Sequence, residues 1–201
     1  MEPVTVVSGR AVPLDRSDVD TDQIIPSDWL KRVERTGFGR GLFSEWRDDP
    51  GFVLNRPEHQ GATILVAGPN FGIGSSREHA VWALMDYGFR AVVSPRFADI
   101  FRTNCTKQGL VPVEVDPELG RALLRAVQED PGLEVTIDVV RLTIEAPAAG
   151  LAGRFPLDEF TQQRLLHGWD DVGLTLRHEP AIEAYERSLP DWLPRVAPNP
   201  S

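Results

Sequence analysis

The sequence has little cysteine and little lysine, and it has no long apolar run. The single cysteine, Cys105, excludes a disulfide within the chain, which is typical of proteins from a reducing compartment. One cysteine also excludes an iron–sulfur cluster held by this chain alone, because such clusters take three or four thiolates. We therefore interpret Cys105 as a small buried hydrophobic residue.

Features of membrane proteins and of nucleic-acid-binding proteins are missing as well. No apolar run approaches the roughly 20 residues that cross a bilayer, and no signal peptide is predicted at the N-terminus. The net charge is −9, and Lys31 and Lys107 are the only lysines, whereas phosphate contacts need clustered basic side chains. We therefore predict a cytoplasmic protein with no nucleic-acid partner and no membrane partner. An anionic ligand would be held by individual arginines and backbone N–H groups.

The 201 residues suit one α/β domain. Apolar patterns predict strands at 4–7, 62–67, 91–94 and 110–115, a hairpin of 133–137 and 140–144, and a short strand at Phe155. Helices are predicted at 75–87, 98–104, 117–129, 158–167 and 180–187. Weak periodicity at about 31–61 predicts a flexible substrate loop. We predict one domain over 1–189 and a proline-rich, disordered tail over 190–201.

The strongest local signal is a glycine-rich segment between a strand and a helix, Gly68-Pro-Asn-Phe-Gly-Ile-Gly-Ser-Ser-Arg-Glu-His79. Gly72 and Gly74 permit positive φ and close approach of a ligand. Ser75, with Glu78 three residues later, predicts a capping box at the start of the helix. A helix start attracts anions, and the guanidinium of Arg77 fits a carboxylate. The segment indicates either an anion site or simply a capped helix after a tight turn.

This segment fails the tests for the standard nucleotide and hydrolase loops. Arg77 stands where a dinucleotide fingerprint has its third glycine. The Gly-Lys-Ser/Thr of a P-loop and the Gly-x-Ser-x-Gly of a nucleophile elbow are both missing from the sequence. Nucleotide binding and serine-hydrolase chemistry are therefore excluded at this segment.

Several separate motifs resemble those of a known family. Phe71-Gly-Ile-Gly-Ser-Ser-Arg-Glu-His-Ala80 resembles the signature of the swivelling domain of the aconitase superfamily, and the resemblance continues at 88–89, 94–101 and 108–113. Residues 19–26 and 35–39, with 172–176 and 181–185 near the C-terminus, resemble the bacterial-type small subunit of 3-isopropylmalate dehydratase. The motifs occur in the family's order over about residues 4–189.

The resemblance implies a swivelling β/β/α domain with extra C-terminal helices. It implies a large-subunit partner that carries a [4Fe–4S] cluster, with no cofactor or metal bound by this chain. The implied reaction is the isomerisation of 2- and 3-isopropylmalate, which are dicarboxylates, by dehydration and rehydration in leucine biosynthesis. The alternatives are a related hydro-lyase subunit for citraconate, dimethylmalate or homoaconitate, and a non-catalytic dicarboxylate-binding module.

The resemblance also implies roles for residues of the glycine-rich segment. Ser75 matches the serine that takes the proton from the substrate carbon, and Ser76 and Arg77 match residues that bind a substrate carboxylate. Gly72 and Gly74 form the anion loop between them. Glu78 and His79 are expected to support the site from behind. Ile73 stands where many such subunits have cysteine, and we expect it to alter loop packing without removing activity.

Further site residues are expected before the glycine-rich segment. Asp22 is expected at the edge of the site, with a turn or capping role as the alternative. An arginine for the second carboxylate is expected in the loop 31–47, as either Arg32 or Arg35, and Arg35 is preferred because a glycine follows closely. Val33 or Phe38 in the same loop is expected to contact the isopropyl group.

Overall fold

The computed structural model describes residues 1–31, 36–190 and 192–193 of the chain. Its centre is one mixed sheet with the strand order β4-β3-β2-β1-β5-β6-β7. The strands are β1 (Val6–Leu14), β2 (Ile64–Ala67), β3 (Ala91–Ser94), β4 (Val111–Glu114), β5 (Glu134–Asp138), β6 (Thr143–Ala146) and β7 (Leu151–Arg154). Strands β1 to β4 are parallel, whereas β5, β6 and β7 are antiparallel to their neighbours.

Strand β1 joins the two halves of the sheet. Its residues 11–14 pair with β2, and its residues 6–10 pair with β5. The strand predicted at 4–7 therefore continues to Leu14, through Ser8-Gly9-Arg10, where the apolar pattern is interrupted. Backbone pairing with β5 holds this stretch in the strand, and such pairing cannot be predicted from the local apolar pattern. The predicted hairpin of β5 and β6 is confirmed, and the strand predicted at Phe155 is β7, which ends one residue earlier.

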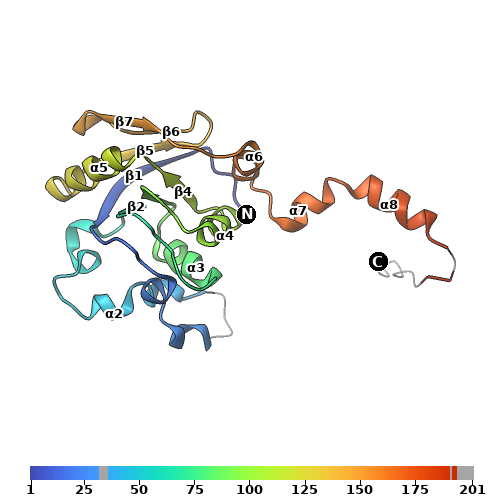
Figure 1. The fold of residues 1–201 in the computed structure, drawn as a ribbon, viewed down its shortest axis with the longest axis horizontal. Coiled ribbons are helices and arrows are strands. Elements are labelled where there is room, and N and C mark those ends of the chain that lie inside the picture. Colours follow the sequence, from blue (N-terminus) through green and yellow to red (C-terminus); the bar gives the residue numbers. More distant parts are fainter. Residues whose placement is uncertain (32–35, 191, 194–201) are drawn as a thin grey trace.

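Three helices cover the two faces of the sheet: α3 (Glu78–Tyr87), α4 (Asp99–Gln108) and α5 (Pro117–Glu129). Alternate residues of the parallel strands β1, β2 and β3 enter separate cores, because side chains alternate along a strand. Leu65 and Ala67 of β2 pack in the core of α3 and α4. Ile64 and Val66 pack in the core of α5, which has the bounds predicted from its sequence. The glycine-rich segment leaves β2 on the side of α3 and α4 (Figure 1).

The segment expected to be one long loop contains short helical turns in its described part. They are 3₁₀ turns at Phe38–Arg40, Val53–Asn55 and Pro57–His59, and the helix α2 (Ser44–Arg47). Earlier in the chain lie α1 (Thr21–Ile24) and a 3₁₀ turn at Ser27–Lys31. Several apolar side chains of the segment are buried: Phe38, Leu42, Phe43, Phe52 and Leu54. Turns of three or four residues are too short to show a helical period, so the sequence pattern missed them.

Three helices follow the sheet: α6 (Glu159–His167), α7 (Asp171–Leu176) and α8 (Glu179–Ser188). Helix α6 packs on the body of the molecule through Leu165, which is fully buried. In Figure 1, α7 and α8 project away from the body, and every residue of α8 is exposed. Residues 191 and 194–201 of the predicted tail lie outside the described residues.

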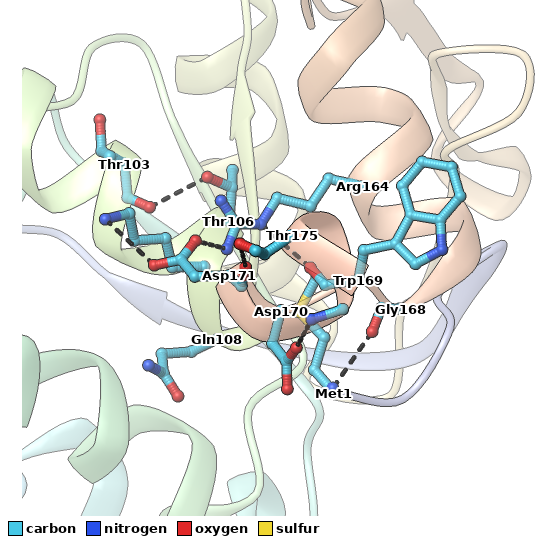
Figure 2. A network of polar contacts seen from close by, with 12 residues as sticks. Met1, Thr103, Thr106, Gln108, Arg164, Gly168, Trp169, Asp170, Asp171 and Thr175 are labelled. Atoms are coloured by element: carbon cyan, nitrogen blue, oxygen red, sulfur yellow. Dashed lines mark hydrogen bonds and ion pairs between the residues drawn. The ribbon is translucent and has the colours of Figure 1, made fainter. Parts of the chain in front are cut away.

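One buried arginine joins this projecting arm to the body (Figure 2). The Arg164 side chain, which is 7% exposed, donates hydrogen bonds to Asp171 Oδ1 at 2.5 Å and to the carbonyl of Trp169 at 3.1 Å. Lys107 Nζ of α4 lies 3.7 Å from the other oxygen of Asp171. The hydrogen bond from Arg164 holds the pKa of the Asp171 carboxyl below its ordinary value. The ion pair is therefore fully formed at pH values above the ordinary pKa of a carboxyl group. It is lost only as the pH falls through the lowered pKa of Asp171.

We expect Arg164→Met to loosen the arm, because methionine keeps apolar length but donates no hydrogen bond. Loss of charge-assisted hydrogen bonds lowers the free energy of unfolding by about 2 kcal/mol, and cleavage by a protease within 170–189 becomes faster. Chemical denaturation and limited proteolysis measure the two effects. The matched control is Arg187→Met, which removes an exposed pair with Glu183 and changes stability by about 0.5 kcal/mol or less. Equal effects of the two substitutions would contradict the anchoring role.

Candidate active site

The glycine-rich segment is held by hydrogen bonds to Val19 and to Thr21, the first residue of α1. The N–H groups of Gly72 and Ile73 both donate to the carbonyl of Val19, at 2.7 and 3.2 Å. The Thr21 N–H donates to the carbonyl of Ile73 at 2.9 Å, and the Thr21 hydroxyl donates to the carbonyl of Ser75 at 2.8 Å. Gly72 and Gly74 have φ values of +79° and +89°, as predicted for this turn.

The predicted capping box at Ser75 is wrong. Helix α3 begins at Glu78, its N-cap residue is Arg77, and that residue makes no side-chain capping bond. The long-range bond from Thr21 holds the carbonyl of Ser75 outside the helix, and the Glu78 carboxylate accepts from Gln108 Nε2 of α4 instead. The Ser75 side chain is consequently exposed and is not used for capping. Ser75 lies three residues before the helix.

The capping box in this region belongs to α1. The Asp20 carboxylate accepts from the backbone N–H of Gln23 at 2.8 Å, and the Gln23 side chain accepts from the N–H of Asp20 at 3.0 Å. Asp20 is therefore used to start α1, which leaves Asp22, in the first turn, for another contact.

Five of the predicted site residues line one cavity of about 230 Å³. They are Gly72, Gly74, Ser75, Ser76 and Arg77. The rest of the lining comes from Thr21 and from the start of α4, with Ala98, Asp99, Ile100 and Phe101. The α4 residues were not singled out from the sequence, although they fall in the 94–101 motif of the resemblance. The cavity brings a hydroxyl pair and a guanidinium to one concave surface.

Arg77 is held by the carboxylate of Asp22. Its Nη1 donates to Asp22 Oδ1 and, at 3.5 Å, to the carbonyl of Ile25. The Arg77 side chain is 17% exposed and that of Asp22 is 54% exposed, so the pair lies at the margin of the cavity. Both contacts use the same nitrogen. Within the described residues, Nε and Nη2 make no hydrogen bond, so this edge of the guanidinium keeps its donors unused.

Glu78 and His79 lie behind this cavity and do not line it. The ring of His79 packs 5.3 Å from Phe38 and 4.7 Å from Trp82, measured between ring centroids. Phe38 is 1% exposed and takes no part in the cavity lining, so the expectation that it contacts the isopropyl group is wrong. Arg32, Val33 and Arg35 lie outside the described residues.

Known proteins are similar to this chain over nearly its whole length. The family model described as the aconitase C-terminal domain matches residues 1–118, and the model of the C-terminal domain of the 3-isopropylmalate dehydratase small subunit matches residues 171–198. A 3-isopropylmalate dehydratase small subunit from Rubrobacter xylanophilus is 63% identical, and the match covers 98% of this chain and 100% of that one. One from Parafrankia sp. is 64% identical over the same shares. The chain belongs to the family of 3-isopropylmalate dehydratase small subunits.

A solved structure supports the assignment to this small-subunit family. The crystal structure of a 3-isopropylmalate dehydratase from Methanocaldococcus jannaschii is 28% identical, with a TM-score of 0.65, and the match covers 90% of this chain and 99% of that one. The predicted fold, that of the aconitase C-terminal domain with added C-terminal helices, is thereby confirmed. Membership as a small subunit implies a large-subunit partner.

The side chains that the structure describes do not form a site that fits a metal cluster. Cys105 is fully buried as predicted, and burial raises the pKa of its thiol well above the ordinary value, whereas a metal ligand must be a thiolate. Over residues 1–31, 36–190 and 192–193, no three His, Cys, Asp or Glu side chains group as metal ligands. In the same ranges, no helix has the length and apolar character to cross a membrane.

Gly72 is expected to tolerate no side chain, because an added Cβ would lie 2.2 Å from Cγ of Phe101. We expect Gly72→Ala to lower the free energy of unfolding by about 3 kcal/mol or more, from backbone strain at positive φ together with overpacking. The matched control is Gly150→Ala, where φ is +65° and no atom lies within 4 Å of the added Cβ; strain alone costs about 1–2 kcal/mol there. Urea denaturation measures both. Equal losses would show that the Phe101 contact does not constrain the loop.

Proposed function

We propose that this chain supplies one wall of the active site of a 3-isopropylmalate dehydratase, and that the large subunit supplies the other wall with its [4Fe–4S] cluster. The reaction is the isomerisation of 2- and 3-isopropylmalate by dehydration and rehydration, in leucine biosynthesis. The observation that carries the proposal is the cavity at which Ser75, Ser76 and Arg77 meet. Because these serines are exposed, the wall is open for a partner chain to complete.

In this proposal, Arg77 binds a carboxylate of the substrate. Its Nη1 is held by Asp22, so the remaining edge is oriented before the substrate arrives. A guanidinium edge binds a carboxylate through two parallel N–H···O bonds. Asp22 then acts as a positioning residue for Arg77, and Ser76 adds a hydroxyl beside the same carboxylate. Arg35, expected to hold the second carboxylate, keeps that role in the proposal as a residue of the family motif.

Ser75 is proposed to take the proton from the substrate carbon. A serine hydroxyl is a poor base unless its alkoxide is stabilised, and each pKa unit of lowering corresponds to about 1.4 kcal/mol. Positive charge is available nearby, because Arg77 lines the same cavity and the N-terminus of α3 follows three residues later. The hydroxyl is exposed for this role because capping does not use it.

The cluster of the large subunit supplies a Lewis acid for the leaving hydroxyl when the two chains are assembled. Relatives named for 3-isopropylmalate, with identities of 54–64% over nearly the whole chain, favour that substrate over citraconate, dimethylmalate or homoaconitate. Family membership also argues against a non-catalytic binding module. The proposal places the enzyme in the cytoplasm, because its substrates are intermediates of amino-acid biosynthesis. It includes no nucleic-acid partner and no membrane partner.

We expect Ser75→Ala to lower the turnover of 3-isopropylmalate at least about 100-fold, because a positioned base contributes a factor of this size. The chain is mixed with a cognate large subunit that holds an intact cluster, and the alkene intermediate is followed by ultraviolet absorption. Binding of the large subunit stays unchanged, as gel filtration would show. Ser8→Ala, whose hydroxyl lies 2.9 Å from that of Thr136 on the sheet, serves as the control and keeps full activity. Turnover near the wild-type rate in Ser75→Ala would sink the proposed base.

Arg77→Lys is expected to raise the KM for 3-isopropylmalate about 10-fold or more, because lysine keeps the charge but loses the two-pronged edge. Asp22→Asn should raise KM less, since it frees Arg77 without removing it. Steady-state kinetics of the reconstituted complex measures both variants. Arg187→Lys, at the exposed pair with Glu183, is the matched control with unchanged KM. A larger effect of Asp22→Asn than of Arg77→Lys would contradict the assigned order of roles.

A further inference from the structure

The chemistry of the substrate places an alkyl group beside the proposed base. In 3-isopropylmalate, the carbon that loses its proton on dehydration also carries the isopropyl group. If Ser75 takes that proton, the isopropyl group lies within a few ångströms of the serine. The part of the cavity next to Ser75 therefore needs an apolar surface of its own, because a branched alkyl group left in water gains nothing from binding.

The start of α4 provides that apolar surface. Three apolar side chains of this region line the cavity: Ala98, Ile100 and Phe101. Phe101 is 2% exposed, and its ring is used against Gly72. Ile100, by contrast, is 53% exposed. Among the exposed large apolar side chains of the described residues, Ile100 is the one that lines this cavity.

Charge on the two walls of the cavity favours one orientation of a dicarboxylate. Asp99, next to Ile100, lines the cavity and is exposed, so a substrate carboxylate near the start of α4 would meet a like charge. Arg77 on the glycine-rich wall attracts a carboxylate instead. When a carboxylate of the substrate binds Arg77, the uncharged part of the substrate, its alkyl group, contacts the α4 wall.

The α4 wall is fixed relative to the glycine-rich segment. The Phe71 N–H donates to the carbonyl of Arg96, and the Ala98 N–H donates back to the carbonyl of Phe71, both at 3.0 Å. The rings of Phe71 and Phe101 pack with centroids 5.3 Å apart. The backbone that carries Ile100 is therefore anchored to the segment that carries the serines, and a residue that discriminates between alkyl groups needs such a fixed position.

From these observations we propose that Ile100 contacts the isopropyl group and sets the preference of the enzyme for a branched alkyl substituent. The inference rests on the proposed function and adds to it a specificity-determining residue on the small subunit. Ile100 takes the role that the sequence predicts for Phe38, which is buried against His79 and Trp82.

The test compares two substrates that differ only in the alkyl group, 3-isopropylmalate and 3-methylmalate, with the complex of the full chain and its cluster-carrying large subunit. The measured quantity is the ratio of their kcat/KM values. Ile100→Ala is expected to lower this ratio about 10-fold, the size of effect that one hydrophobic contact supplies. Its kcat/KM for 3-methylmalate should change less than about 3-fold. Ile100→Phe is expected to lower the ratio as well, because the larger ring fills the space of the branched group.

Val140→Ala is the matched control, since Val140 is 56% exposed in the turn between β5 and β6 and does not line the cavity. Its ratio should equal that of the wild type. An unchanged ratio in both Ile100 variants overturns the inference. A proportional fall for both substrates also overturns it, because it assigns Ile100 to docking of the partner chain. The proposed function is tested separately by Ser75→Ala. If that variant keeps its turnover, the proposed function fails, whatever ratio the Ile100 variants give.

Discussion

The site depends on the backbone pairing between the glycine-rich segment and residues 19–21. Hydrogen bonds from Gly72 and Ile73 to Val19, and from Thr21 to Ile73 and Ser75, tie the segment to the start of α1. This pairing competes with a helix that would start at Ser75. The pairing is preferred because its several hydrogen bonds stabilise the chain more than one local capping bond would. Two glycines with φ near +80 to +90° allow the turn that it requires. Helix α3 starts later as a result, and the Ser75 hydroxyl is left exposed.

The same pairing sets the position of the charged groups. With residues 19–21 placed along the segment, Asp22 in the first turn of α1 comes within hydrogen-bonding reach of Arg77. An arginine that is already paired through one nitrogen has lost part of its side-chain freedom before binding, so less entropy is lost when a carboxylate binds. The lack of a Cβ at Gly72 lets Phe101 approach, and through it α4 forms the opposite wall. Backbone geometry at a few residues thus places the serine hydroxyls, the Arg77 guanidinium and the apolar side chains of α4 around one cavity.

In the proposed function, the small subunit supplies the residues that bind and orient a substrate, and its partner carries the rest of the site. Its single thiol is buried in the core between the sheet and helices α3 and α4 and is a poor candidate for a ligand. The exposed serines, Ile100 and the projecting α7 and α8 are surfaces that a lone chain leaves in water. The proposed division of the site between two chains accounts for a cavity wall whose serines are exposed.

The sequence by itself determined the buried strands, helix α5 and the positions of the two glycines with positive φ, because these follow from short-range apolar periods and from the conformational freedom of glycine. Resemblance to a family pointed to Ser75, Ser76 and Arg77, and the cavity brings these three together. Tertiary structure alone decided that α3 begins at Glu78, because the competing bond to Ser75 comes from a residue 54 positions earlier. It also decided that Phe38 is buried while Ile100 faces the cavity. Burial depends on which elements meet in space, and that contact is not encoded within any window of a few residues.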